Sequence, residues 1–137
     1  MLAVDTNIIV RLAVTDDPKQ TGIVRHLFAH SEIWISKTVL LETEWVLRYK
    51  YANTAREIHG FFMKLLGLPN VACESNEQIA KALVWYKAGM DLADALHLAS
   101  SSLAAQFVTF DKDCGKKAAR LKTKPRVRIA AAESPRG

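Results

Sequence analysis

The chain has 137 residues, of which 50 % are hydrophobic and 24 % are charged, and its formal net charge is +5. This length predicts one domain with one ordinary core, and the composition excludes an intrinsically disordered chain. No apolar run approaches the ~18 residues of a membrane span, and the first residues carry no secretory signal, so the cytoplasm is the expected location. Cys73 and Cys114 are too few for a disulfide scaffold or a thiolate zinc site.

Hydrophobic periodicity predicts alternating strands and helices along the chain. The expected strands are 2–4, 33–35, 71–73, 107–110 and 127–130. The expected helices are 7–14, one that starts at Asp17, one from Ser36 to about Tyr49, one from Thr54 to Gly67, one from Ser75 or Asn76 to Gly89, then 91–104 and 113–121. This order predicts an α/β fold in which a mainly parallel central sheet is flanked by helices. We expect a single domain over residues 1–130 and a short C-terminal tail over 131–137.

Capping residues mark several of the predicted helix starts. Asp17 precedes Pro18 and is the expected N-cap of its helix, while Thr54 and Glu57 have the spacing of a capping box. An apolar stripe is expected to turn the helix after Asp17 toward the core, and its members are Ile23, Val24, Leu27 and Phe28.

The positive charge is concentrated toward the C-terminal end. Between residues 112 and 128, eight Lys and Arg residues stand against a single Asp. Such a basic segment on a slightly acidic body indicates either a polyanionic partner or a solvated helix face followed by a charged tail.

Two aspartates directly follow predicted strands. Asp5 comes after the strand 2–4, and Asp111 comes after the strand 107–110. Ligands of open parallel sheets bind beyond the carboxyl ends of the strands, so both residues are candidates for a functional site. Capping of the next helix is the competing interpretation for each, because Asp is a favoured N-cap residue.

Glu42 and Glu44 lie on one predicted helix but differ in their neighbours. Trp45 and Val46 flank Glu42 at helical spacing, so its face is expected to point inward. A lone carboxylate there costs several kcal/mol unless it is paired or metal-bound, which favours a site role for Glu42. Glu44 is expected at the surface, because Arg48 four residues later suits an ordinary surface ion pair. A slipped helix phase would exchange the two.

Asp91 and Asp94 share one face of the predicted helix 91–104, with Asp91 as a possible N-cap. A cluster of like charges repels itself unless some members hold protons or a divalent cation binds. Oxygen-only ligands suit Mg²⁺ or Mn²⁺, which can activate water and stabilise the leaving oxygen of a phosphodiester. The acidic residues and the basic segment together predict metal-dependent cutting of a nucleic acid.

Four short motifs follow one another along nearly the whole chain. They are Val4-Asp5-Thr6-Asn7 with Arg11, Leu40-Leu41-Glu42-Thr43-Glu44-Trp45-Val46-Leu47, Gly89-Met90-Asp91-Leu92-Ala93-Asp94-Ala95-Leu96, and Thr109-Phe110-Asp111-Lys112-Asp113. In this order the motifs resemble the PIN-domain family, in particular the small VapC-type ribonuclease toxins of prokaryotic toxin–antitoxin pairs. The chain departs from that pattern at Cys114, where relatives commonly carry a bulky apolar residue.

The resemblance implies an endoribonuclease that depends on Mg²⁺, or on Mn²⁺ in its place, and hydrolyses RNA phosphodiester bonds. Its catalytic residues would be Asp5, Glu42, Asp94 and Asp111. Asp5 and Asp94 are the expected metal ligands, and the further candidates are Glu42, Asp111, Asp91 and Asp113. The resemblance also implies a homodimer and a hetero-oligomer with a cognate VapB-type antitoxin, whose C-terminal segment would fill the acidic groove.

Other residues near these motifs have supporting roles to test. Thr6, Asn7 and Thr109 are candidates for orienting the carboxylates, against ordinary turn and cap chemistry. Arg11, Lys112 and Lys116 are candidate contacts to substrate phosphate, although Arg11 also suits an ion pair. His97 could act as a general base, but a packed histidine is the favoured interpretation. For Trp34, Trp45, Trp85, Phe61 and Phe62, the spacing favours a core or an interface over base stacking.

Two other functions fit parts of the sequence. A catalytically silent PIN-type module would bind RNA through the basic segment without cutting it, but all four acidic positions are filled. A phosphatase or phospho-acceptor domain would need partners that the sequence does not offer, because Asn7 stands where HAD-type phosphatases carry a second Asp.

Overall fold

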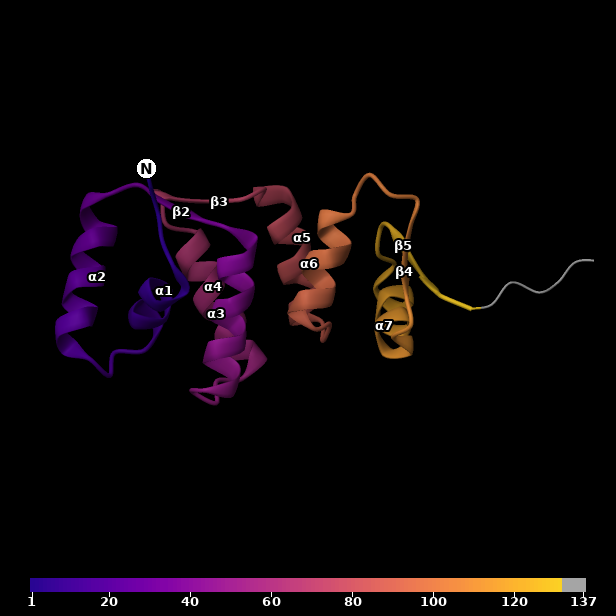
Figure 1. Ribbon diagram of the computed structural model, residues 1–137, viewed down its shortest axis with the longest axis horizontal. Helices are drawn as coiled ribbons and strands as arrows, with labels where there is room; N and C mark the ends of the chain where they lie inside the picture. The colour runs from indigo at the N-terminus through magenta and orange to yellow at the C-terminus, as the bar shows by residue number, and fades with distance from the viewer. Residues whose placement is uncertain (132–137) are drawn as a thin grey trace, which may run out of the picture. The chain divides into compact units, whose positions relative to one another are not determined.

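Strands and helices alternate along the computed structural model, which describes residues 1–131 (Figure 1). The chain forms two compact units, of which the first is Met1–Ala80 and the second starts at Lys81. The single domain expected over residues 1–130 stays a prediction. The tail expected over 131–137 lies outside the described residues except for its first member.

The first unit contains a parallel sheet of three strands with helices between them. Its elements are β1 (Leu2–Ala3), α1 (Thr6–Ala13), α2 (Pro18–His30), β2 (Ile33–Ile35), α3 (Lys37–Tyr49), α4 (Ala55–Leu66) and β3 (Val71–Cys73). The strand order is β1-β2-β3, with Leu2 opposite Ile33 and Ile33 opposite Val71. Side chains of β2, α3 and α4 supply the core of this unit, including the fully buried Ile35, Leu40 and Phe62.

The second unit contains a parallel pair of strands covered by a helix. After α5 (Asn76–Lys87), which begins in the first unit, it comprises α6 (Leu92–Ser100), β4 (Gln106–Thr109), α7 (Lys112–Leu121) and β5 (Arg126–Ile129). Phe107 lies opposite Val127 in the ladder. Gly115 permits the close approach of α7 to β5, because a Cβ atom there would lie only 2.9 Å from Ile129 Cδ1.

The predicted fold class is confirmed, since all strand pairs of the described residues are parallel and helices connect the strands. The strands at 33–35 and 71–73 have the predicted bounds. The caps are also confirmed: Asp17 accepts a hydrogen bond from the Gln20 amide, and Thr54 and Glu57 form a reciprocal capping box. These signals are local in sequence, which is why they could be recognised without the structure.

Two local predictions are wrong. The helix expected to reach residue 104 ends at Ser100, where the C-cap Ser101 leaves the helical conformation and its amide bonds back to the Leu98 carbonyl. The expected inward stripe of α2 is shifted: Ile23 is exposed, and Thr21 is buried with Val24 and Phe28. Thr21 takes an inward position because its methyl group packs as an apolar one and its hydroxyl donates to the Arg11 carbonyl at 3.4 Å.

Candidate functional site

The start of α1 brings Thr6 to Glu42 in the first unit. Asp5 follows β1 and caps α1, and its Oδ1 accepts a hydrogen bond from the Thr6 amide at 2.7 Å. The Thr6 side chain is buried, and its hydroxyl donates to Oε1 of Glu42 on α3. The exposed Asp5 and Glu42 are therefore both held by Thr6, one through its backbone and one through its side chain. This contact fits the predicted orienting role of Thr6.

The predicted placement of Glu42 and Glu44 on α3 is wrong. Glu42 is exposed, whereas Glu44 is 1 % exposed and belongs to the inward face of the helix. Arg48 satisfies the buried carboxylate in a two-pronged ion pair, with Nε 2.9 Å from Oε2 and Nη2 3.1 Å from Oε1. The charge of Glu44 can be buried because the Arg48 guanidinium lies against both of its oxygens, as a hydrogen-bond donor to Oε1 and as an ion-pair partner of Oε2.

The physical reason for this exchange is the phase of α3. Its inward stripe consists of Leu40, Thr43, Glu44 and Leu47. That spacing of three, four and seven residues is as good a helical face as the one through Trp45 and Val46. Trp45 instead points outward, and its side chain is 58 % exposed. Sequence reasoning missed Glu44 as a buried structural residue, and the stripe of Leu40, Thr43 and Leu47 was the signal that could have found it.

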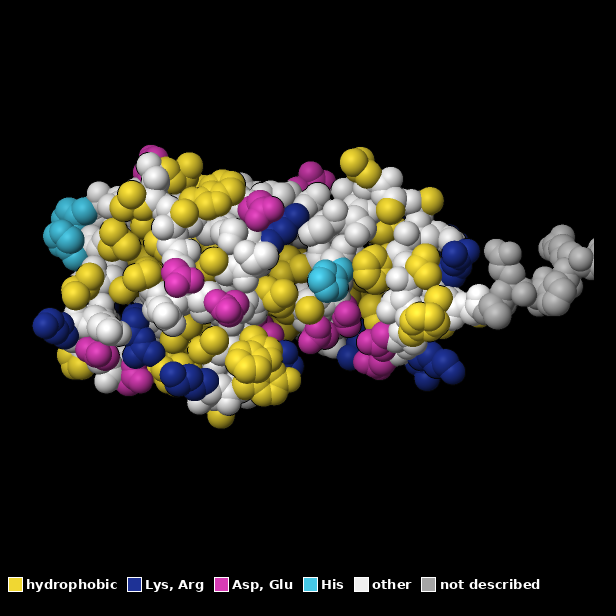
Figure 2. Space-filling view, in the orientation of Figure 1, with side chains coloured by type: hydrophobic (Ala, Val, Ile, Leu, Met, Phe, Trp, Pro, Cys, Tyr) yellow, Lys and Arg dark blue, Asp and Glu magenta, His cyan; other side chains and the backbone are white. Residues whose placement is uncertain are grey.

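Acidic residues occupy the starts of both α6 and α7 in the second unit, where magenta side chains gather in Figure 2. Asp91 caps α6 and accepts hydrogen bonds from the amides of Ala93 and Asp94 at 3.1 and 3.4 Å. Asp111 caps α7 through the amides of Asp113 and Cys114 at 3.0 and 3.1 Å. Asp94 lies in the first turn of α6 and is half-buried. Asp91 and Asp111 thus each cap a helix and also belong to the acidic cluster.

The charge of Asp94 is disfavoured by its surroundings. Partial burial raises the pKa of Asp94, and the neighbouring charges of Asp91 and Asp111 raise it further, against the opposing effect of His97 and Lys117. A cation that neutralises the negative charge of the cluster would stabilise the ionised form of Asp94. The side chains around Asp94 therefore have the electrostatics that favour binding of a positive ion.

The thiol of Cys114 lies beside the same cluster. Burial, followed by the charges of Asp94, Asp111, Asp113 and Asp91, raises the pKa of Cys114 to about 11. The thiol is therefore protonated at neutral pH and packs as a small apolar group, which favours a structural role.

The donor chemistry of these acids fits a hard divalent cation. All candidate ligands supply carboxylate oxygens, which Mg²⁺ and Mn²⁺ prefer over zinc-type nitrogen or sulfur ligands. Asp5 and Glu42 belong to the first unit, and Asp94 and Asp111 belong to the second. Within residues 1–131, no group of three or more His, Cys, Asp or Glu side chains is arranged to hold a metal ion together.

The supporting residues differ in their surroundings. Thr109 Oγ1 accepts a hydrogen bond from the Asp111 amide at 3.1 Å, so it positions the chain at that aspartate. Asn7 is exposed beside Thr6. Arg11 pairs with Asp16 and donates to the Tyr51 hydroxyl at 2.5 Å, which supports its ion-pair interpretation.

The charged side chains of α7 also differ in their surroundings. Asp113 pairs with Lys117 at 2.9 Å, whereas Lys112 and Lys116 are exposed. The prediction of a packed His97 is wrong: the residue is exposed on the outer side of α6, and its ring lies near that of Phe107 with centroids 6.5 Å apart and planes 13° apart.

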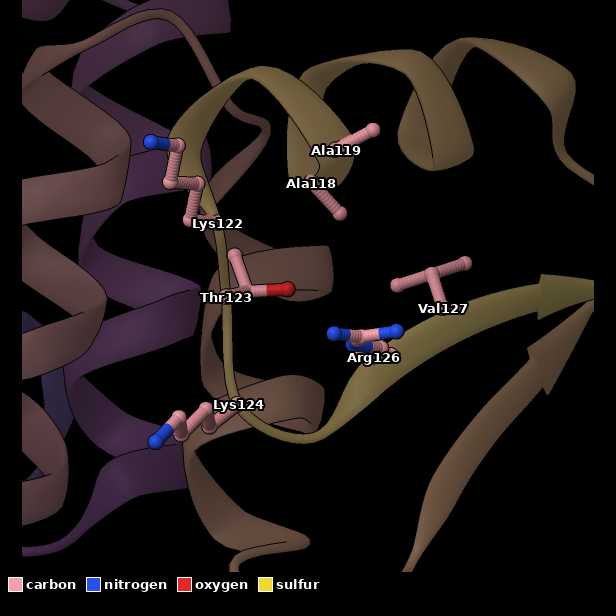
Figure 3. Close-up of a pocket in the computed structure, with 7 residues that line it drawn as sticks. All are labelled: Ala118, Ala119, Lys122, Thr123, Lys124, Arg126 and Val127. Carbon is pink, nitrogen blue, oxygen red and sulfur yellow. The ribbon is translucent and has the colours of Figure 1, made fainter.

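The basic segment also lines a cavity of about 470 Å³ between the end of α7 and β5 (Figure 3). Ala118 and Val127 face each other across it, and the Thr123 hydroxyl points inward and donates to the Pro125 carbonyl at 3.1 Å. Lys122 and Lys124 contribute to its lining but direct their ammonium groups away from it. None of the predicted acidic residues lines this cavity.

Comparison with known proteins gives one informative result. The family model of the PIN domain matches residues 2–121 of the chain. PIN domains have a nuclease-like fold, generally act as nucleases on RNA and typically use divalent metal ions. A search of the curated proteins returns no match to this sequence.

Proposed function

Because the chain belongs to the PIN-domain family, we propose that it is a metal-dependent endoribonuclease that hydrolyses RNA phosphodiester bonds. Its catalytic residues are Asp5, Glu42, Asp94 and Asp111. In this proposal the protein is the toxin of a VapBC-type toxin–antitoxin module. It works in the cytoplasm as a homodimer, and a cognate VapB-type antitoxin binds it in a hetero-oligomer. The order of the four acidic motifs along the chain supports this assignment.

The observation that carries the proposal is the crowding of carboxylates around Asp94. Asp91 and Asp111 both act on the half-buried Asp94 and raise its pKa. A folded protein retains such repulsion where a bound cation or a substrate relieves it, so perturbed acids of this kind are typical of functional sites. The raised pKa of Cys114 keeps the one thiol beside this cluster protonated, so the carboxylates are the better candidates for the role.

The chain's own residues divide the work as follows. Asp5 and Asp94 hold the metal ion, with Glu42, Asp111, Asp91 and Asp113 as further or water-mediated ligands. When bound, Mg²⁺ or Mn²⁺ supplies an activated water and neutralises charge on the phosphodiester. Thr6 orients Glu42 through its hydroxyl, and Thr109 supports the backbone at Asp111. Asn7 helps to orient the carboxylates, and Lys112, Lys116 and Arg11 attract the substrate phosphates.

The membrane plays no part in this proposal. Among the helices of the described residues, none combines the length and the apolar character needed to cross a bilayer. The excess of Lys and Arg near the C-terminal end instead favours RNA as the partner, because a basic segment raises the local concentration of a polyanion.

The test is cleavage of a labelled total-RNA pool by the purified protein with Mg²⁺, Mn²⁺ or EDTA. We expect cuts at discrete sites with either metal and none with EDTA. Asp94→Asn should abolish cutting, whereas Glu77→Gln, which changes an exposed acid in the first turn of α5, should not. Retained cutting by a folded Asp94→Asn protein would contradict the proposal. RNA binding without cutting under any metal would indicate the silent RNA-binding module.

A further inference from the structure

The last turns of α2 carry two histidines on one exposed face. His26 and His30 stand four residues apart, so they lie one helical turn from each other, and both are exposed. Their ring centroids are 4.1 Å apart and the ring planes are 27° apart, which makes them a stacked pair. Figure 2 shows histidine side chains gathered over α2, where they are open to solvent. Neither residue belongs to the four acidic motifs or to the proposed ribonuclease site.

One hydrogen bond determines which nitrogen of His30 holds the lone pair. Nδ1 of His30 lies 2.9 Å from the backbone carbonyl oxygen of His26. A carbonyl oxygen can only accept a hydrogen bond, so Nδ1 carries the proton of the neutral ring, and the lone pair is on Nε2. Metal-binding histidines have this arrangement, because the nitrogen that does not bind the metal donates to a carbonyl or carboxylate and so orients the ring.

The spacing of the two rings fits a single metal ion. Zinc–nitrogen bonds are about 2.0–2.1 Å long, so two nitrogens on a tetrahedral ion lie about 3.3 Å apart. The tilt of 27° brings one side of the two rings closer together than their centroid separation of 4.1 Å. Imidazoles at positions i and i+4 on one helix face can therefore bind the same ion.

The surroundings of the pair leave space for an ion and its water molecules. Gly22 stands one turn before His26, and a Cβ atom there would have no heavy atom within 4 Å. His30 is the last residue of α2, so the pair lies at the negative end of the helix dipole. The dipole therefore favours a positive charge at this place.

The ligand atoms select the class of ion. Mg²⁺ prefers carboxylate oxygens and water, whereas imidazole nitrogens suit Zn²⁺, Ni²⁺ and Cu²⁺. In the part of the chain that the structure describes, no third His, Cys, Asp or Glu side chain completes a metal-binding group with this pair. Water molecules would therefore fill the remaining positions around the ion, as they do in open zinc sites.

We propose that His26 and His30 form a two-histidine site that binds one Zn²⁺, Ni²⁺ or Cu²⁺ ion, with Nε2 as the ligand atom of His30. The site lies in the first unit, and its nitrogen ligands distinguish it from the carboxylates proposed to hold Mg²⁺. The protein would thus bind two chemically different metal ions at separate places.

The test is calorimetric titration of the full-length protein with Zn²⁺ and, separately, with Ni²⁺. The variants are His26→Ala and His30→Ala, and both should fold as the wild type does because the two side chains are exposed. His59→Ala is the matched control, since it removes an imidazole from α4 instead. Asp94→Asn is the second control, because it detects an ion that is held by the carboxylates.

Each of the two alanine variants should bind Zn²⁺ at least about tenfold more weakly, since even the loss of an outer partner of a metal ligand costs about 10–100-fold. His59→Ala and Asp94→Asn should keep the wild-type affinity. Electron paramagnetic resonance of the Cu²⁺-loaded wild type should show coupling to two imidazole nitrogens, and His26→Ala should lose one of them. Cleavage of RNA with Mg²⁺ should not respond to His26→Ala.

Equal Zn²⁺ affinity of the wild type and both alanine variants overturns the two-histidine site. Loss of Zn²⁺ binding in Asp94→Asn with unchanged binding in His26→Ala also overturns it, since the carboxylates would then hold the ion. A wild-type dissociation constant weaker than about 1 mM overturns it as well, because two imidazoles acting together should bind more tightly than that.

Discussion

The hydroxyl group of Thr6 donates a hydrogen bond to Oε1 of Glu42 and so joins the start of α1 to the middle of α3. Thr6 itself is 4 % exposed, so this hydrogen bond is shielded from water on the threonine side. A buried donor restricts the rotamers of the exposed carboxylate that it holds. In the proposed site, Thr6 would therefore act as a positioning residue for Glu42.

Thr6→Val should lower cleavage activity about tenfold, because loss of a residue that orients a metal-binding carboxylate typically costs 10–100-fold. Valine keeps the volume and the apolar packing of Thr6 but has no donor. Thr6→Ser should recover most of the activity, since it restores the hydroxyl. The measurement is kcat together with the Mg²⁺ concentration for half-maximal activity. Loss of activity through unfolding would show as a changed circular dichroism spectrum and would contradict a positioning role.

Glu42→Gln and Glu44→Gln should have opposite effects, although the two residues are only two positions apart on α3. Glu44→Gln breaks the ion pair with Arg48, so the free energy of unfolding should fall by about 2–3 kcal/mol. This loss is below that of a fully buried pair, because the Arg48 side chain is 36 % exposed. Glu42→Gln should change the free energy of unfolding by less than about 0.5 kcal/mol, since its amide oxygen can still accept from Thr6.

Urea denaturation and RNA cleavage of the same two variants complete this comparison. Glu42→Gln should reduce kcat by about a hundredfold or more, whereas Glu44→Gln should retain cleavage at temperatures where it is folded. An unstable Glu42→Gln with a stable Glu44→Gln would mean that the helix phase of α3 is the one expected from Trp45 and Val46.

Stability of the metal-free protein should depend on the protonation of Asp94. The pKa of this group is raised in the folded state from its ordinary value of 3.8, so the folded protein holds the proton to higher pH than the unfolded chain does. The contribution of Asp94 to stability is therefore fully present below pH 3.8 and is lost as the pH rises through its folded-state pKa.

Asp94→Asn removes this titration and should be more stable than the wild type at neutral pH in EDTA. The difference should shrink toward low pH, where both side chains are neutral. Thermal unfolding of both proteins across this pH range is the measurement. Added Mg²⁺ should stabilise the wild type more than the variant. A pH-independent difference between the two proteins would show that Asp94 does not carry the effect.

The sequence predicted those features that depend on neighbouring residues. The start of α3 after Ser36 and the capping box of Thr54 and Glu57 are decided within one helical turn, and both are confirmed. The end of α6 at Ser100 had no Gly or Pro to mark it, and the prediction overran it. Local sequence signals thus predict the order and the starts of the helices and strands more accurately than the residues at which they end.

The candidate site was harder to predict, because its residues depend on tertiary contacts. Two faces of α3 were nearly equivalent in sequence, and only packing of Leu40, Thr43 and Leu47 decides which of Glu42 and Glu44 is buried. The contact between Thr6 and Glu42 joins residues 36 positions apart, and no local spacing could reveal it. The sequence could nominate the acidic residues by their motifs, but not their partners.

The close approach of α7 to β5 makes Gly115 sensitive to substitution without any chemical role of its own. The smallest added side chain would meet Ile129 and push against the helix that Asp111 caps. In a growth selection that relies on the proposed toxin activity, changes at this glycine should therefore be recovered alongside changes of the acidic residues. A second substitution that shortens the Ile129 side chain should rescue such alleles. The same substitution should not rescue alleles that have lost one of the carboxylates.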